Sequence, residues 1–150
     1  MKISRILPIV FFVSICSLNA YSVGRHFAKP RDTTYEILIT GHQSNGKLVL
    51  QDASGKNVDT LNVQYDDDII WTNTDPGIII EGIKEKSGTG HHFKYDPTQD
   101  PQNSKKWDAK VAHYTDNKMH ISKYYIKWKD SNGEDKKYDP LIRINPNQLP

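Results

Sequence analysis

The amino-acid sequence predicts an all-β protein that folds as an antiparallel β-sandwich of about eight strands. Two observations lead to this fold class. Short runs rich in Ile, Val, Tyr and Thr are separated by turn signals every eight to twelve residues, a pattern typical of sandwiches and barrels. In addition, no ten-residue window shows the 3.6-residue apolar period of an amphipathic helix.

Residues 1–20 have the layout of a secretory signal peptide. Lys2 and Arg5 precede an apolar run from Ile6 to Ile15, and small or polar residues follow it. This run is well short of the ~20 residues that span a bilayer. We therefore expect an exported protein, secreted or periplasmic, whose mature chain is not inserted in a membrane.

The mature chain is expected to form one β-sandwich domain over residues 35–150, after a polar leader at residues 21–34. The single cysteine, Cys16, lies inside the signal, so the mature protein cannot form an internal disulfide. The sequence has 20 Lys and Arg residues, two of them in the signal, and 18 Asp and Glu residues. The mature formal charge is therefore zero, and this composition argues against nucleic acid as a partner.

Eight segments carry the strand pattern. They are Tyr35–Thr40, Lys47–Gln51, Val58–Gln64, Asp68–Thr72, Ile78–Lys84, Lys110–Tyr114, Met119–Lys129 and Leu141–Ile144. The turn sequences QSNGK, DASGK and KDSNGEDKK place glycine where hairpins need a positive φ, and Asn132-Gly133 suits a type I′ turn. Such turns favour antiparallel pairing of strands that are neighbours in sequence.

The apolar residues of MHISKYYIKW change register along the segment. Met119 and Ile121 occupy odd positions, whereas Tyr124, Ile126 and Trp128 occupy even ones. One face of a strand can hold both sets only if an extra residue forms a bulge, which we expect near Ser122-Lys123.

Three consecutive acids, Asp66–Asp68, precede the segment that contains Trp71. Carboxylate oxygens suit calcium, but the alternating acids and glycine of an EF-hand loop do not follow. We expect a turn in which Asp66 or Asp67 accepts hydrogen bonds from nearby backbone.

The chain changes character between Lys86 and Asp108, where glycines, prolines and polar residues replace the aliphatics. A connection this long inside a compact domain is usually functional or mobile, although it can also be a solvated crossover between sheets. We expect this loop to contact a partner, an unidentified protein or glycan. Trp107, at its end, is the candidate partner-binding residue.

Two segments resemble cupredoxins, the blue-copper family. DDDIIWTNTDP resembles the family's strand that ends in Thr-Asn before a loop, and KYYIKW with YDPLIRI resembles its last two strands. The resemblance spans roughly Tyr35 to Ile144 and implies a Greek-key sandwich. Blue copper needs two histidines and a cysteine thiolate, but the matching positions hold Gly77, the isoleucines that follow it, and Trp128. The resemblance therefore implies a cupredoxin-like fold without type 1 copper.

Other residues could bind copper in a different arrangement. Imidazole and thioether groups are suitable ligands, and the candidates are His91, His92, His113, Met119 and His120. The alternative, scattered surface histidines, predicts no such site.

The sequence contains none of the common catalytic motifs that we considered. It lacks a Gly-x-Ser-x-Gly elbow, a phosphate-binding glycine loop and an HExxH motif. We therefore expect an exported, non-catalytic binding or interaction module without a cofactor. Two alternatives stay open: a copper-binding or electron-transfer protein with non-standard His/Met ligands, and a carbohydrate-binding module that uses exposed aromatic residues.

Overall fold

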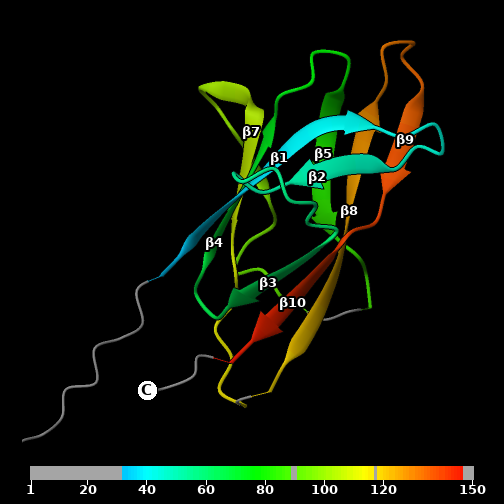
Figure 1. Ribbon diagram of the computed structural model, residues 1–150. Coiled ribbons are helices and arrows are strands. Elements are labelled where there is room, and N and C mark those ends of the chain that lie inside the picture. Colours follow the sequence, from blue (N-terminus) through cyan, green and yellow to red (C-terminus); the bar gives the residue numbers. More distant parts are fainter. Residues whose placement is uncertain (1–31, 89–90, 117, 147–150) are drawn as a thin grey trace, which may run out of the picture.

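The computed structural model describes residues 32–88, 91–116 and 118–146, so the expected signal peptide and most of the leader lie outside the described residues (Figure 1). Within these ranges the protein is all-β and has no helix, which confirms the predicted fold class. One sheet has the strand order β2-β1-β4-β7-β6, and the other has the order β3-β10-β8-β5, with β9 paired to β8. The strands are β1 (Thr34–His42), β2 (Leu48–Gln51), β3 (Thr60–Gln64), β4 (Asp68–Asn73), β5 (Ile79–Glu85), β6 (Thr98–Asp100), β7 (Asn103–Lys110), β8 (His120–Lys129), β9 (Asp135–Tyr138) and β10 (Leu141–Asn145).

Both sheets are mixed, so the expectation of purely antiparallel sheets is wrong at two ladders. β1 pairs with β4 in parallel, and β10 pairs with β3 in parallel. Parallel neighbours cannot be joined by a tight hairpin. The chain instead leaves the first sheet after β2, forms β3 in the second sheet, and returns to place β4 beside β1.

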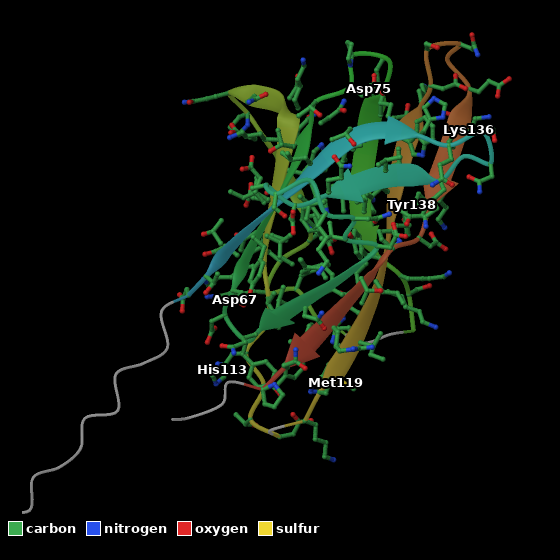
Figure 2. All side chains as sticks on the ribbon, in the orientation of Figure 1. Asp67, Asp75, His113, Met119, Lys136 and Tyr138 are labelled. Atoms are coloured by element: carbon green, nitrogen blue, oxygen red, sulfur yellow. The ribbon has the colours of Figure 1, made fainter. Side chains whose placement is uncertain are left out.

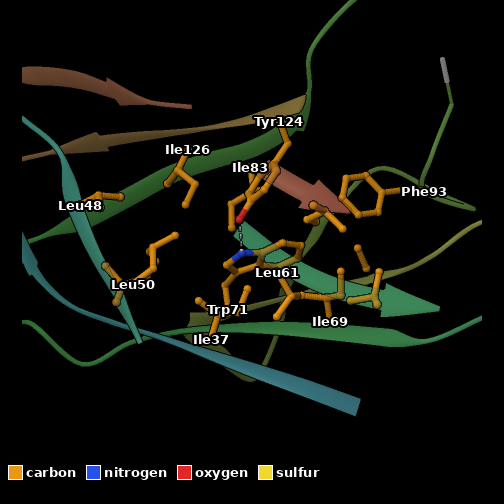
Figure 3. Close-up of a cluster of buried hydrophobic side chains, with 14 of the residues drawn as sticks. Ile37, Leu48, Leu50, Leu61, Ile69, Trp71, Ile83, Phe93, Tyr124 and Ile126 are labelled. Atoms are coloured by element: carbon orange, nitrogen blue, oxygen red, sulfur yellow. Dashed lines mark hydrogen bonds between the residues drawn. The ribbon is translucent and has the colours of Figure 1, made fainter. Parts of the chain in front are cut away.

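The core lies between the two sheets and is built from alternating strand residues. In β4 and β8 every second side chain is buried, and Trp71, Tyr124 and Trp128 are almost fully inaccessible to solvent. Figure 3 shows Trp71 of β4 facing Tyr124 of β8 across the sandwich, with isoleucines and leucines around them. The Trp71 indole N–H donates to the Tyr124 hydroxyl at 3.2 Å, which satisfies the one polar atom of that indole.

The second half of the expected loop between Lys86 and Asp108 is a β-hairpin. β6 and β7 lie there, and the strand expected at Lys110–Tyr114 is wrong because β7 ends at Lys110. The sequence TQDPQNSKK lacks the β-branched run that marks a strand. These residues pair because β7 is hydrogen-bonded to the buried strand β4, with Trp107 opposite Trp71.

β8 has no bulge, and the expectation of one near Ser122-Lys123 is wrong. Its register with β10 is continuous, and Ser122 is buried on the same side as Tyr124. Met119 and Ile121 are therefore exposed, at 53% and 46%. The register irregularities lie instead in β1, in β5 and in β6.

Three hairpins share one turn geometry. In each, a glycine with φ near +80° donates to the carbonyl three residues earlier, as Gly133 does to Asp130 at 2.9 Å. Gly46 and Gly55 occupy the same place in their turns, which confirms the expected positive φ. Asn132 has no positive φ, so the predicted type I′ turn is wrong; the pattern is that of a three-residue loop closed by a glycine bulge.

The acidic segment before β4 is a turn, as expected. Asp66 has a φ of 67°, and the carboxylate of Asp67 is buried. Asp67 accepts hydrogen bonds from the backbone N–H groups of Gln64 at 2.6 Å and Thr33 at 2.9 Å. Burial raises the pKa of Asp67, although these hydrogen bonds oppose the shift. The carboxylate thus joins the end of β3 to the segment before β1.

Candidate functional site

Several of the predicted site residues lie at one end of the sandwich. His92 is buried, and its ring lies 5.8 Å from that of His120, measured between centroids. Tyr114 stacks on His120 at 4.1 Å with an interplanar angle of 20°, and Tyr65 contacts Tyr114 at 5.4 Å. We call these four residues the His–Tyr cluster.

Hydrogen bonds identify Nδ1 of His92 as a donor. The Tyr114 hydroxyl donates to the backbone carbonyl of His91 at 2.7 Å, so it accepts from Nδ1 of His92, also at 2.7 Å. Nε2 of His92 is buried, and no described residue bonds it. Burial, with a smaller effect from the Glu85 charge, raises the pKa of Tyr114 to about 12.

Of the other metal candidates, His120 belongs to the His–Tyr cluster, whereas His113 and Met119 do not. His113 pairs with Asp66 at 2.7 Å, His120 pairs with Asp116 at 3.1 Å, and Figure 2 shows His113 and Met119 at separate points of this end. Nδ1 of His92 is engaged by the Tyr114 hydroxyl, which leaves Nε2 as the ring nitrogen without a described partner. Within the described ranges, no three His, Cys, Asp or Glu side chains are placed to hold a metal ion.

The His–Tyr cluster connects segments that are distant in sequence. The Tyr65 hydroxyl donates to the carbonyl of Lys118 at 2.6 Å, and Glu85 accepts from the backbone N–H of His92 at 2.7 Å. These bonds tie the turn after β3, the end of β5 and the segment before β8 together. The hydrogen bonds and aromatic contacts of the His–Tyr cluster thus close this end of the sandwich.

Trp107, the candidate partner-binding residue, lies in a strand and not in a loop. It lies within β7, packs partly buried against the core, and pairs with Trp71 and Gln99 on the neighbouring strands. Its Nε1 is buried and has no hydrogen-bond partner among the described residues. Trp71 and Trp128 are also buried, so the three tryptophans do not form an exposed row for sugar rings.

A second region, the outer face of the β3-β10-β8-β5 sheet, has a marked charge imbalance. Its outward positions follow from the strand registers. They hold six cations, namely Lys84, Lys123, Lys127, Lys129, Lys137 and Arg143, against two acids, Glu81 and Asp135. We call this surface the basic face.

The two acids of the basic face are both engaged by one lysine. Lys129 lies 2.7 Å from Glu81 and 3.7 Å from Asp135. The other five cations have exposed side chains, and no described carboxylate lies within ion-pair distance of them. Lys137 instead sits over the ring of Tyr125, with Nζ 4.1 Å from the ring centroid.

The outer face of the first sheet has no such excess. Its outward charged positions on β1, β4 and β7 are Glu36, Asp68, Lys106, Asp108 and Lys110. Lys110 lies 3.3 Å from Asp68 and 3.3 Å from Asp32. The charges of the described residues are therefore unevenly divided between the two faces.

The sequence carried a partial signal for the basic face. In SKYYIKWK, lysines stand at positions 123, 127 and 129, and apolar residues fill the even positions between them. Reading the segment as a strand without a bulge places these lysines on one outer face. Lys84, Lys137 and Arg143 come from other strands, and only the registers bring them beside β8.

Comparisons with known proteins leave the family open. No family model and no curated protein matches the chain. Among solved structures, a crystal structure of a cysteine protease inhibitor from Entamoeba histolytica aligns with a TM-score of 0.39 and 10% sequence identity, over 79% of this chain and 100% of that one. A likeness at this level establishes neither a shared fold nor a shared function. The resemblance to cupredoxins stays a prediction.

Proposed function

We propose that this protein is an exported, non-catalytic binding module that recognises an anionic partner through the basic face. The observation that supports the proposal is the group of five exposed cations that no described carboxylate neutralises. Like charges held on one rigid sheet repel each other, and an anionic partner relieves that repulsion while it gains Coulomb attraction.

The fold prepares this surface before a partner arrives. The cations stand on β5, β8 and β10, whose inward side chains are buried in the core, and on β9, which pairs with β8. The lysine and arginine side chains stay flexible, but their Cα positions are fixed, so binding orders only the side chains. Association of this kind is fast at low ionic strength and weakens as salt screens the charges.

The experiment is a salt-dependent binding measurement on the mature, secreted chain. Immobilised dextran sulfate serves as a generic polyanion, and binding is followed by biolayer interferometry between about 50 mM and about 500 mM salt. We expect retention that decreases with salt, although the formal net charge of the mature chain is zero. The charge-reversal variant Lys123→Glu/Lys127→Glu is expected to lose most of this binding to dextran sulfate.

A matched control variant is Lys56→Glu/Lys105→Glu, which changes the net charge equally at exposed positions outside the basic face. Equal losses in both variants would mean that only net charge matters. Absence of binding by the wild-type chain at about 50 mM salt would reject the proposed function.

A further inference from the structure

We infer that the anionic partner is a linear acidic polysaccharide that lies along β8; this inference rests on the proposed function. Three features of the surface favour this partner: the order of the five free cations along the strand, the kinds of side chain beside them, and the covered aromatic ring between them.

The cations form a stripe along β8. Arg143 lies opposite Ile121, Lys84 lies opposite Tyr125, and Lys137 lies opposite Lys127, while Lys123 stands between the first two pairs. Outward positions on a strand repeat every ~6.6 Å, and neighbouring strands are ~4.8 Å apart. Each outward position of β8 from Ile121 to Lys127 therefore either holds a cation or lies opposite one on the neighbouring strand. A chain of anionic groups meets all of them, whereas a small anion meets one or two.

The groups in the stripe suit polysaccharide better than a partner that requires exact geometry. Four of the five free cations are lysines, which act as mobile point charges rather than as the planar fork of arginine. On the adjacent strand β3, the exposed Thr60, Asn62 and Gln64 lie beside β10 and offer neutral hydrogen-bonding groups. Sulfate or carboxylate groups pair with the lysines, and sugar hydroxyls pair with these polar side chains.

One end of the stripe is hollowed. A depression of about 280 Å³ is lined by Lys127, Lys136, Lys137, Glu81 and Asp135. Both acids lie beside Lys129, and Lys136 is paired with Glu134. Lys127 and Lys137 are therefore the lysines that present unneutralised charge to the depression. Its size admits one charged substituent of a sugar ring, which fixes the end of the chain on the sheet.

The aromatic ring in the stripe is not available for stacking. Lys137 covers the Tyr125 ring, with Nζ 4.1 Å from the centroid. Single-stranded nucleic acid is held mainly by bases stacked on open aromatic rings. An acidic protein partner would need buried apolar anchors, and within the described part of this face the large exposed apolar side chains, Ile121 and Ile79, stand at opposite ends of β8. Acidic glycan is therefore the partner that the surface fits.

The test compares four anionic probes against the mature, secreted chain at equal charge concentration. They are a heparin-derived octasaccharide, polyglutamate, an oligo-dT strand and phosphatidylglycerol vesicles. We expect the octasaccharide to bind most tightly, with a slope of log K against log salt of about −3.5 if all five free cations make contact. In Lys123→Gln/Lys127→Gln we expect about 30-fold weaker binding and a slope of about −2. Lys56→Gln/Lys105→Gln is expected to match the wild type.

The outcomes separate this inference from the proposed function. Tighter binding of polyglutamate, oligo-dT or vesicles, lost in the Lys123→Gln/Lys127→Gln variant, would overturn the glycan assignment and leave an anion-binding basic face. Failure to bind any of the four probes would overturn both. Circular dichroism and thermal melting of each variant show whether it is folded. We expect each variant to fold, because the substituted lysines are exposed.

Discussion

The hydrogen bond between Trp71 and Tyr124 joins the two sheets inside the core, and its removal gives a quantitative test of the fold. In Tyr124→Phe the indole N–H of Trp71 loses its acceptor in a fully buried position. The variant loses the net value of a hydrogen bond and leaves a buried donor without a partner. Together these effects cost about 2 kcal/mol of the free energy of unfolding.

For a domain of this size, the unfolding entropy is about 0.24 kcal/mol per kelvin, so the expected fall in melting temperature is about 8 °C. Urea denaturation followed by circular dichroism gives the free energy directly. In the Trp71→Phe background no N–H is left unpaired, and the same Tyr124→Phe change is then expected to cost less than about 0.5 kcal/mol. Tyr125→Phe, on the outer face of the same strand, is the control and is expected to be nearly neutral. Equal costs of Tyr124→Phe in both backgrounds would refute the assignment of the bond.

Three further predictions follow from the same reasoning. Burial raises the pKa of Tyr114, so above pH about 10 the folded protein keeps the Tyr114 proton while the unfolded chain loses it. The urea midpoint of unfolding should therefore fall as the pH rises above about 10. This fall should be less steep in Tyr114→Phe. In Trp107→Phe we expect stability within about 1 kcal/mol of the wild type and unchanged polyanion binding, because the indole N–H has no partner to lose and lies off the basic face; a large loss of binding would restore Trp107 as the contact residue. For the copper alternative, metal analysis and the visible spectrum of the mature protein are decisive: with Cys16 in the expected signal we predict no intense blue band, and stoichiometric copper uptake that His92→Gln abolishes would favour that alternative over the basic face.

The sequence by itself determined the fold class and most of the strands, because these depend on local patterns. Short runs rich in Ile, Tyr and Thr between turn signals placed β4 and β8, and glycines that need a positive φ placed the hairpin turns. Where the local pattern was weak, the strand prediction was wrong. β6 and β7 contain few apolar residues and exist because a buried strand offers hydrogen bonds to them. The prediction of a bulge in β8 was wrong because Ile121 is exposed, and an apolar residue on a solvent face resembles a change of register.

Only the tertiary structure decided which residues lie together. His92 and His120 come from different segments, and the stack of Tyr114 on His120 could not be read from their spacing in the chain. The same holds for charge. Net charge is a sum that ignores position, so the sequence indicated a neutral protein without a basic field. Strand pairing then placed Lys84, Lys137 and Arg143 beside the lysines of β8, since register, and not order along the chain, sets which side chains share a face.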